Sequence, residues 1–311
     1  METAPLYNDV AYGPEGGAAH WVTASDGVRI RVAHWMAPQA KGTVLVFPGR
    51  TEFIEKYGDA ALEFTNAGYA TAVIDWRGQG LADRMQPDRG LGYVRQFSDY
   101  QDDVTAMLDH VRALSLPEPY YLVGHSMGGC IGLRALLNDL PVKACMFSAP
   151  MWGIMMAPPT RPFAWVVTTA ARALGLDSRI APGQTTQNYT AITPLADNTL
   201  TSDPRMYEIM QEQLRKYPDL ALGGPSMTWL NEALREMLAL SRMPSPDIPC
   251  LTFLGTDEQI VTPSRIHERM KRWPKGELVI VPDGRHEVML ETSAIRRTVY
   301  DRTIAHFAAH S

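Results

Sequence analysis

The sequence predicts an α/β protein in which helices cover both faces of a mostly parallel central sheet and a helical cap is inserted between two strands. Three observations lead to this prediction. Short apolar runs typical of buried strands alternate with helical patterns along most of the chain. A hairpin pattern precedes them, and residues 151–243 contain helical patterns but no clear strand pattern. Because strand patterns resume after residue 243, we interpret this interval as an insertion rather than as a separate C-terminal domain.

The predicted hairpin lies near the N-terminus. In HWVTASDGVRIRVAHW, apolar and polar residues alternate on both sides of Asp26-Gly27, which is typical of two antiparallel strands joined by a tight turn. Six apolar runs follow, and several are continuous, as expected for strands buried on both faces of a parallel sheet. These six runs are Thr43–Phe47, Ala70–Asp75, Tyr120–Val123, Val142–Phe147, Cys250–Leu254 and Glu277–Val281.

Helical patterns separate these runs. They cover Glu55–Asn66, Tyr100–Leu114, Met127–Leu137, Ser264–Trp273 and Ser293–Ala309. Within the inserted interval, helical patterns such as RPFAWVVTTAARALGL and MTWLNEALREMLALSR are separated by Pro and Gly. We therefore predict a core formed by residues 1–150 and 244–311, and a cap, or lid, formed by residues 151–243.

The composition limits the class of protein and its partners. The 311 residues are 45% hydrophobic and 20% charged, which is typical of a soluble protein of enzyme size. A formal net charge of −5 without any Lys/Arg run argues against nucleic acid as a partner. Cys130, Cys145 and Cys250 lie far apart in apolar runs, so neither a zinc site nor a disulfide framework is predicted. No signal peptide or membrane-spanning pattern is present, and we expect a cytoplasmic protein.

A serine lies at the turn between a predicted strand and a predicted helix. The stretch YYLVGHSMGG ends an apolar run in small residues around Ser126. A serine at such a sharp turn has strained backbone angles that expose its hydroxyl, and Gly124 and Gly128 allow the strand and the helix to pack closely. The helix N-terminus also directs free backbone N–H groups at the site, where they can stabilise a developing negative charge. We therefore predict Ser126 as a nucleophile.

The residues after the cap contain a candidate base for this serine. A serine nucleophile needs a histidine to accept its proton, and on this kind of sheet the acid and then the histidine follow the serine along the chain. His286 follows the last predicted strand in the loop PDGRH, at the carboxyl end where ligands bind in open α/β sheets. His267, His306 and His310 lie in or beyond helical patterns. His286 is therefore the predicted base.

Two adjacent carboxylates compete for the role of the acid that orients the histidine. Asp257 and Glu258 both follow the apolar run CLTFL. Because neighbouring side chains point in different directions, only one of them can face His286, and strand-end geometry does not separate them. Asp203 and Asp247 are weaker candidates, since no apolar strand leads directly into either.

The sequence resembles the α/β-hydrolase superfamily, specifically its monoglyceride-lipase and bacterial lysophospholipase branch. Five motifs carry the resemblance, in the order FPGRTEF, DWRGQGLADR, GHSMGG, LGTDEQIVTP and GRHEVMLE. The similarity covers nearly all of the chain outside the cap and the first twenty residues. It implies the α/β-hydrolase fold and a serine hydrolase that cleaves lipid-like carboxylic esters through an acyl-enzyme, without a metal or an organic cofactor. The DWRGQG loop is interpreted as structural.

The resemblance also implies roles for further residues. In that family the acid loop reads Gly, two residues, acid, one residue and two aliphatic residues. This pattern places Glu258 in the acid position, where most relatives have Asp, and leaves Asp257 as the alternative. Relatives usually have His-Gly in the oxyanion loop, whereas Pro48-Gly49 is followed here by Arg50. The implied oxyanion donors are the backbone N–H groups of Arg50 and Met127.

The cap is expected to decide the substrate. Met and Trp residues in MWGIMMAPP and RPFAWVV are consistent with an acyl-chain surface and with transient contact with a membrane surface, but equally with a packed cap core. Glu52 is either a contact for a cationic head group or an ordinary carboxylate at a helix start. Besides a lysophospholipase or a monoacylglycerol lipase, the alternatives are a small-molecule carboxylesterase or thioesterase, an acyltransferase, and a non-catalytic binding protein. The last of these would lack a triad position, and all three are filled.

Overall fold

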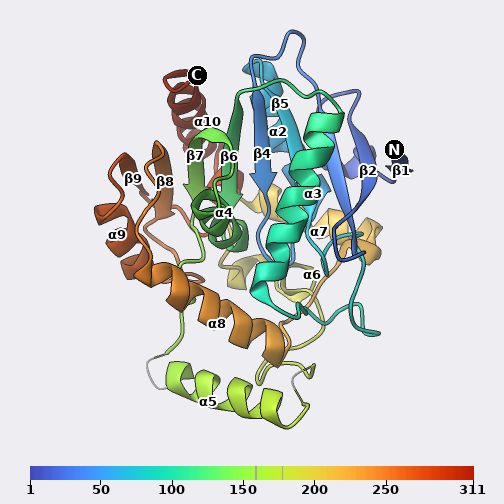
Figure 1. Cartoon of the computed structure of the whole chain (residues 1–311), viewed down its shortest axis with the longest axis vertical. Helices are drawn as coiled ribbons and strands as arrows, with labels where there is room; N and C mark the ends of the chain where they lie inside the picture. Colours follow the sequence, from blue (N-terminus) through green and yellow to red (C-terminus); the bar gives the residue numbers. More distant parts are fainter. Residues whose placement is uncertain (158–159, 177) are drawn as a thin grey trace.

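The computed structural model describes residues 1–157, 160–176 and 178–311. Pro158 and Pro159 of the MWGIMMAPP stretch therefore lie outside the described residues. Among the described residues, nine strands form one sheet in the order β1-β2-β3-β5-β4-β6-β7-β8-β9 (Figure 1). The pairs β1–β2, β2–β3 and β3–β5 are antiparallel and the other five pairs are parallel. The prediction of a mostly parallel sheet is confirmed.

The strands lie close to their predicted positions. They are β1 Glu2–Ala4, β2 Ala18–Thr23, β3 Arg29–Trp35, β4 Thr43–Phe47, β5 Ala70–Asp75, β6 Tyr120–His125, β7 Val142–Ser148, β8 Cys250–Gly255 and β9 Gly276–Val281. The strands β2 and β3 form the predicted hairpin, with Thr23 opposite Arg29. The strand β6 continues to His125 instead of ending at Val123, so the nucleophile turn begins directly at the end of the strand. The short strand β1 was not predicted, because three residues cannot establish an alternating pattern.

The helices also follow the predicted order. They are α1 Asn8–Ala11, α2 Gly58–Asn66, α3 Tyr100–Ala113, α4 Met127–Leu137, α5 Thr160–Ala173, α6 Tyr189–Ile192, α7 Pro204–Lys216, α8 Met227–Arg242, α9 Pro263–Lys271 and α10 Ser293–Ala308. The predicted helix Glu55–Asn66 is wrong at its start, where the short 3-10 helix η1 (Ile54–Tyr57) precedes α2. Contacts distant in sequence hold this turn: the Ile54 N–H donates to Asp75, and the Glu55 carboxylate binds Arg31.

The sheet is buried on both faces. Every residue of β4, β5, β6 and β8 is buried. The helices α2 and α10 cover one face, where Phe64, Tyr300 and Phe307 pack against the sheet. The helices α3, α4 and α9 cover the other face, with Ile131 of α4 among the buried residues (Figure 1). Burial of a large apolar side chain contributes about 1.5–3 kcal/mol, so these layers hold the carboxyl ends of the parallel strands firmly at one edge of the sheet.

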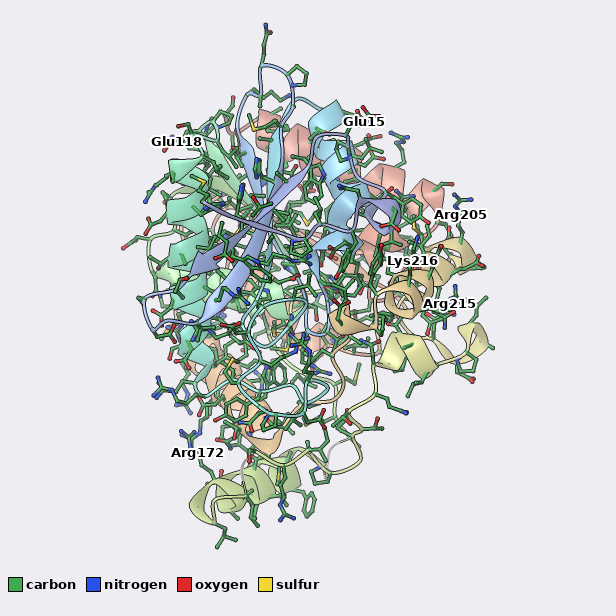
Figure 2. The ribbon with its side chains drawn as sticks, turned by 90° about the vertical axis from the view of Figure 1, so that its right-hand side faces the viewer. Glu15, Glu118, Arg172, Arg205, Arg215 and Lys216 are labelled. Carbon is green, nitrogen blue, oxygen red and sulfur yellow. The ribbon has the colours of Figure 1, made fainter. Side chains whose placement is uncertain are left out.

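Residues 151–243 contain α5, α6, α7 and α8, and in the described part of this interval no strand joins the sheet. The helix α5 packs on α8 at one end of the molecule (Figure 1). In the perpendicular view of Figure 2, α5 carries Arg172 at the end opposite Glu118. The helix α8 also reaches the core, where Met237 and Leu240 pack against residues of the sheet layer. The division into core and cap therefore stays a prediction.

No helix in the described part of the chain combines the length and the apolar character that crossing a membrane would need.

Candidate active site

Ser126 lies at the turn between β6 and α4. Its backbone has φ 49° and ψ −116°, a conformation that L side chains rarely adopt and that costs about 1–3 kcal/mol. The surrounding structure supports this strain, because the Ser126 N–H donates to the Ser148 carbonyl at 3.0 Å and the Ser126 carbonyl accepts from the N–H of Met151 at 2.8 Å. The Ser126 side chain nevertheless reaches the wall of a cavity. The strained turn thus presents the hydroxyl to a space that a ligand can enter.

The glycines around Ser126 are needed for close packing. A Cβ atom at Gly128 would lie 1.9 Å from the Phe47 carbonyl oxygen at the end of β4. A Cβ atom at Gly124 would lie 3.0 Å from the Gly128 carbonyl oxygen and from the ring of Phe147. Real Cβ atoms do not approach backbone oxygen atoms to 1.9 Å, so any side chain at Gly128 would push α4 away from β4.

His286 and Glu258 form a buried hydrogen-bonded pair. The His286 Nδ1 lies 2.8 Å from Glu258 Oε2, while Glu258 Oε1 accepts from the backbone N–H groups of Ile260 and Val261 at 2.6 and 2.9 Å. Burial alone would raise the pKa of Glu258, but His286 and the two N–H groups together lower it below its ordinary value. An ionised carboxylate at Nδ1 favours the tautomer in which Nε2 is free to accept a proton.

The competing carboxylates lie elsewhere. Asp257 is exposed and accepts from its neighbour Thr256. Asp203 caps α7, where it accepts from the N–H groups of Arg205 and Met206, and Asp247 forms an exposed ion pair with Lys275. The structure therefore brings Glu258, and none of these three, to the imidazole of His286.

The competing histidines also lie away from the cavity. His267 is exposed on α9. His306 belongs to the last turn of α10, and His310, just after that helix, bonds through Nδ1 to the His306 carbonyl at 2.8 Å. Of the four histidines compared in the sequence, only His286 lines the cavity.

The loop after β4 carries the predicted oxyanion donors. The backbone N–H groups of Arg50 and Met127 have no hydrogen-bond partner among the described residues. In contrast, the N–H of Gly49 donates to the carboxylate of Glu52. Two free N–H groups, one in the loop after β4 and one directly after Ser126 in the chain, are the kind of donors that form an oxyanion hole, and their role stays a prediction.

Side chains of the DWRGQG loop form hydrogen bonds to the backbone of the loop that carries Arg50. The Trp76 indole N–H donates to the Pro48 carbonyl at 2.9 Å, and the Gln79 amide donates to the Gly49 carbonyl at 3.0 Å. The Gln79 amide oxygen also accepts from the N–H of Thr51 at 3.1 Å. The interpretation of this motif as structural agrees with these bonds, which hold the backbone carbonyl groups of Pro48 and Gly49.

Ser126 and His286 line a cavity of about 640 Å³, a size typical of ligand pockets. Much of its lining is apolar and comes from residues 151–243. Apolar lining residues include Ile154, Met155, Met156, Phe163, Val167 and Met210. The expectation of methionines near the cavity is confirmed, whereas the expectation for tryptophan is wrong for Trp152. This side chain packs on Trp273 and donates to the Gly129 carbonyl, because its ring fills the core below α4.

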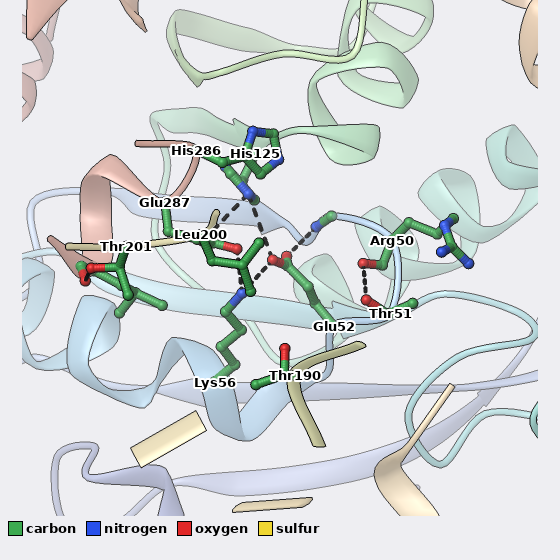
Figure 3. Close-up of polar contacts among 12 residues, drawn as sticks. Arg50, Thr51, Glu52, Lys56, His125, Thr190, Leu200, Thr201, His286 and Glu287 are labelled. Carbon is green, nitrogen blue, oxygen red and sulfur yellow. Dashed lines mark hydrogen bonds and ion pairs between the residues drawn. The ribbon is translucent and has the colours of Figure 1, made fainter. Parts of the chain in front are cut away.

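Four buried charged side chains adjoin the pair of His286 and Glu258, and three of them were not predicted from the sequence. Lys56 Nζ lies 2.5 Å from an oxygen of Glu52 and 2.5 Å from an oxygen of Glu287 (Figure 3). The Nε2 atom of His125 lies 3.3 Å from Glu287 and 3.6 Å from Glu52. The His125 and His286 rings are 4.7 Å apart between centroids. We call Glu52, Lys56, His125 and Glu287 the charge cluster.

The charge cluster is electrically balanced when His125 is protonated. Burial alone would lower the pKa of His125, but the carboxylates of Glu287 and Glu52 raise it above its ordinary value. Burial would raise the pKa of Glu287, but His125 and Lys56 lower it well below its ordinary value. Burial likewise opposes the charge on Lys56, yet the two carboxylates raise its pKa. With His125 protonated, two anions and two cations compensate one another in the wall of the cavity.

Glu52 has neither of the roles considered from the sequence. Its carboxylate accepts from the Gly49 N–H, from Lys56 and from the Tyr57 hydroxyl. It is therefore fully engaged inside the protein and not available to a cationic head group. Glu52, His125 and Glu287 place ligand atoms close enough together to hold a metal ion, but Lys56 already occupies the position between the two carboxylates.

Sequence comparison identifies the family. Residues 38–293, which make up most of the chain, match the family described as serine aminopeptidase, S33. The chain belongs to this S33 family. It is a serine hydrolase with the α/β-hydrolase fold, as its motifs predicted.

Two curated relatives match this hydrolase over nearly its whole length. It is 26% identical over 291 residues to the probable lysophospholipase L2 of Haemophilus influenzae, covering 92% of this chain and 90% of that protein. It is 27% identical over 301 residues to lysophospholipase L2 of Escherichia coli strain K12, covering 93% and 87%. A soluble variant of monoglyceride lipase from Saccharomyces cerevisiae, solved with a substrate analogue, has a TM-score of 0.73 at 20% identity and covers 93% of this chain and 94% of that chain. The structural likeness supports the fold.

Proposed function

We propose that this serine hydrolase cleaves the carboxylic ester of a lipid with a single acyl chain, as a lysophospholipase or a monoacylglycerol lipase does. The observation that carries the proposal is that Ser126 and the His286–Glu258 pair are both next to a cavity whose lining is rich in methionine. The volume of about 640 Å³ suits an extended acyl chain better than a small acyl group. Two relatives with lysophospholipase in their names support the same substrate class.

The proposed reaction is acyl transfer in two steps. The Ser126 hydroxyl attacks the ester carbonyl while Nε2 of His286 accepts its proton, and Glu258 stabilises the resulting imidazolium. The N–H groups of Arg50 and Met127 stabilise the oxyanion. The alcohol leaves with the proton from His286, and water then attacks the acyl-enzyme through the same groups. Each oxyanion donor is expected to contribute about 10²- to 10³-fold in rate.

Contact with lipid surfaces is a further part of the proposal. The helix α5 and the residues after it expose Val166, Leu174 and Leu176 to solvent, and this helix forms one end of the molecule (Figure 1). An exposed apolar helix beside the cavity could enter the edge of a micelle or a vesicle transiently. Sedimentation of the protein with phospholipid vesicles measures this contact directly.

A substrate panel on the purified protein tests the proposal. We expect fatty acid release from a lysophospholipid or a monoacylglycerol with a long acyl chain, and p-nitrophenyl esters should be hydrolysed faster as the acyl chain lengthens towards that size. Ser126→Ala should lose turnover by about 10⁴- to 10⁶-fold and should lose labelling by a fluorophosphonate probe. A preference for acetyl or butyryl esters would favour a small-molecule carboxylesterase, and labelling that persists in the variant would place the nucleophile elsewhere.

A further inference from the structure

One cation in the cavity wall has no anionic partner. Among the charged side chains that line the described cavity, Lys56 and His125 face the carboxylates of Glu52 and Glu287. Arg50 has no carboxylate within ion-pair distance among the described residues. Figure 3 shows its side chain running away from the charge cluster. Its charge is therefore not balanced by a carboxylate of the described residues.

The guanidinium of Arg50 is held in place but not saturated. One Nη1–H donates to the Gly223 carbonyl at 2.8 Å, and the guanidinium carbon lies 5.3 Å from the ring centre of Trp229. Gly223 and Trp229 both belong to the interval 151–243, so these contacts fix the side chain against the cap. An arginine carries five N–H donors, and the other donors of the Arg50 side chain have no acceptor among the described residues. The Arg50 nitrogen atoms that have no hydrogen-bond partner are accessible to solvent, so a ligand in the cavity can reach them.

Two buried arginines of the chain have the hydrogen-bond or ion-pair partners that Arg50 lacks. Arg31 binds the carboxylates of Asp75 and Glu55. Arg269 likewise has no carboxylate partner in the described part of the chain, but its two terminal nitrogen atoms donate to the Leu240 and Met243 carbonyl groups. Burial lowers the pKa of Arg50 to about 10, so the group stays cationic at neutral pH. A cation that is partly desolvated and lacks a counter-ion raises the free energy of the empty site, and an anionic ligand would remove that cost.

The position of Arg50 determines which anion it can meet. Its backbone N–H is the proposed oxyanion donor, so its side chain starts directly beside the reacting ester. In a lysophospholipid the phosphate is joined to the acyl ester through the short glycerol backbone, whereas a monoacylglycerol has no charge there. A guanidinium fork matches phosphate oxygen atoms in a bidentate manner. We infer that Arg50 binds the head-group phosphate of a lysophospholipid and thereby makes this substrate preferred over a monoacylglycerol. This inference rests on the proposed function.

The test compares two substrates that differ in the phosphate. kcat/KM is measured for a 1-acyl-lysophosphatidylcholine and for the 1-monoacylglycerol with the same acyl chain. Arg50→Gln should lower the value for the lysophospholipid by about 10- to 100-fold more than it lowers the value for the monoacylglycerol, the size of a lost charge-assisted hydrogen bond. Arg50→Lys keeps the charge without the fork, and we expect an intermediate loss on the lysophospholipid alone. Arg95→Gln, at an exposed site outside the cavity, is the matched control.

Several results would overturn the inference. An equal loss on both substrates would show that Arg50 acts only through the oxyanion loop or the packing against Trp229, and no loss on the lysophospholipid would show that the phosphate binds elsewhere. If Arg50→Gln does not fold, as judged by its thermal unfolding curve, Arg50→Lys gives the same comparison. A wild-type enzyme that cleaves monoacylglycerol but not lysophospholipid would refute this inference and leave the proposed function standing. Cleavage of short esters alone would refute both.

Discussion

Asp257 and Glu258 are adjacent in the chain, yet their surroundings differ completely. Glu258 is 6% exposed and contacts His286, Ile260 and Val261, whereas Asp257 lies at the surface. The hydrogen-bond donors around Glu258 lower its pKa despite its burial, so it remains an anion over the pH range in which His286 must accept a proton. The local surroundings of the two side chains thus place Glu258, and not Asp257, against the imidazole of His286.

This difference gives a paired prediction. Glu258→Gln should lower kcat by about 10²- to 10⁴-fold, because the neutral amide no longer stabilises the imidazolium and can favour the wrong tautomer. Asp257→Asn should stay within about 3-fold of the wild type, since an exposed loop carboxylate contributes little. Steady-state hydrolysis of one p-nitrophenyl ester by both variants is the measurement. A larger loss in Asp257→Asn would assign the acid role to Asp257.

At the scale of elements, the charge cluster joins segments that are distant in sequence. Glu52 lies just before η1 and Lys56 lies within it, while His125 ends β6 and Glu287 follows the candidate base. Lys56 and Glu287 are 231 positions apart. The cluster therefore ties the oxyanion loop, the nucleophile turn and the base loop together, and we expect it to set their relative positions.

Removal of the central cation tests this coupling. Lys56→Met should lower the free energy of unfolding by about 3–5 kcal/mol, because it leaves two buried carboxylates facing each other without a counter-ion. It should also lower kcat more than it changes KM, since the two loops would shift relative to each other. Urea denaturation and steady-state kinetics measure the two effects. Lys271→Met, at an exposed site on α9, is the control, and an equally small effect in both variants would contradict a positioning role.

At the scale of the whole molecule, the charge cluster makes the free energy of unfolding depend on pH in two separate pH ranges. The pKa of His125 is raised above 6.5 in the folded protein, so its contribution is complete below about pH 6.5 and is lost as the pH rises through the raised value. The pKa of Glu287 is lowered well below 4.5, so its contribution is present above about pH 4.5 and is lost as the pH falls through the lowered value. Stability should therefore be greatest between these two pH ranges.

A histidine variant isolates the upper pH range. The difference in unfolding free energy between the wild type and His125→Gln should be larger at pH 6 than at pH 9, because only the protonated imidazole is stabilised by the two carboxylates. Urea denaturation across this pH range measures it. His267→Gln, at an exposed position, should show no such trend. A difference that grows with pH would mean that His125 is neutral in the folded protein.

Strand order brings the proposed site together. The strands β4, β6, β7, β8 and β9 run parallel and in neighbouring positions, so the loops at their carboxyl ends meet at one edge of the sheet. Arg50, Ser126 and His286 come from three of these loops, and all three line the cavity. The alternation of strand and helix patterns was sufficient to predict this convergence, because a parallel sheet with right-handed crossovers allows few other arrangements.

Local patterns in the chain were sufficient to predict the strands, most helices, the turn at Ser126 and the position of His286 after the last strand, because each depends on neighbours within a few residues or on the end of a strand. Other features were decided only by the folded structure. These are the hydrogen bond between Glu258 and His286, the ion pair between Glu52 and Lys56, the core position of Trp152 and, among the described residues, the lack of a carboxylate partner at Arg50. Side-chain direction and ion pairing depend on groups that are distant in sequence, and no periodic pattern records which of these groups folding brings together.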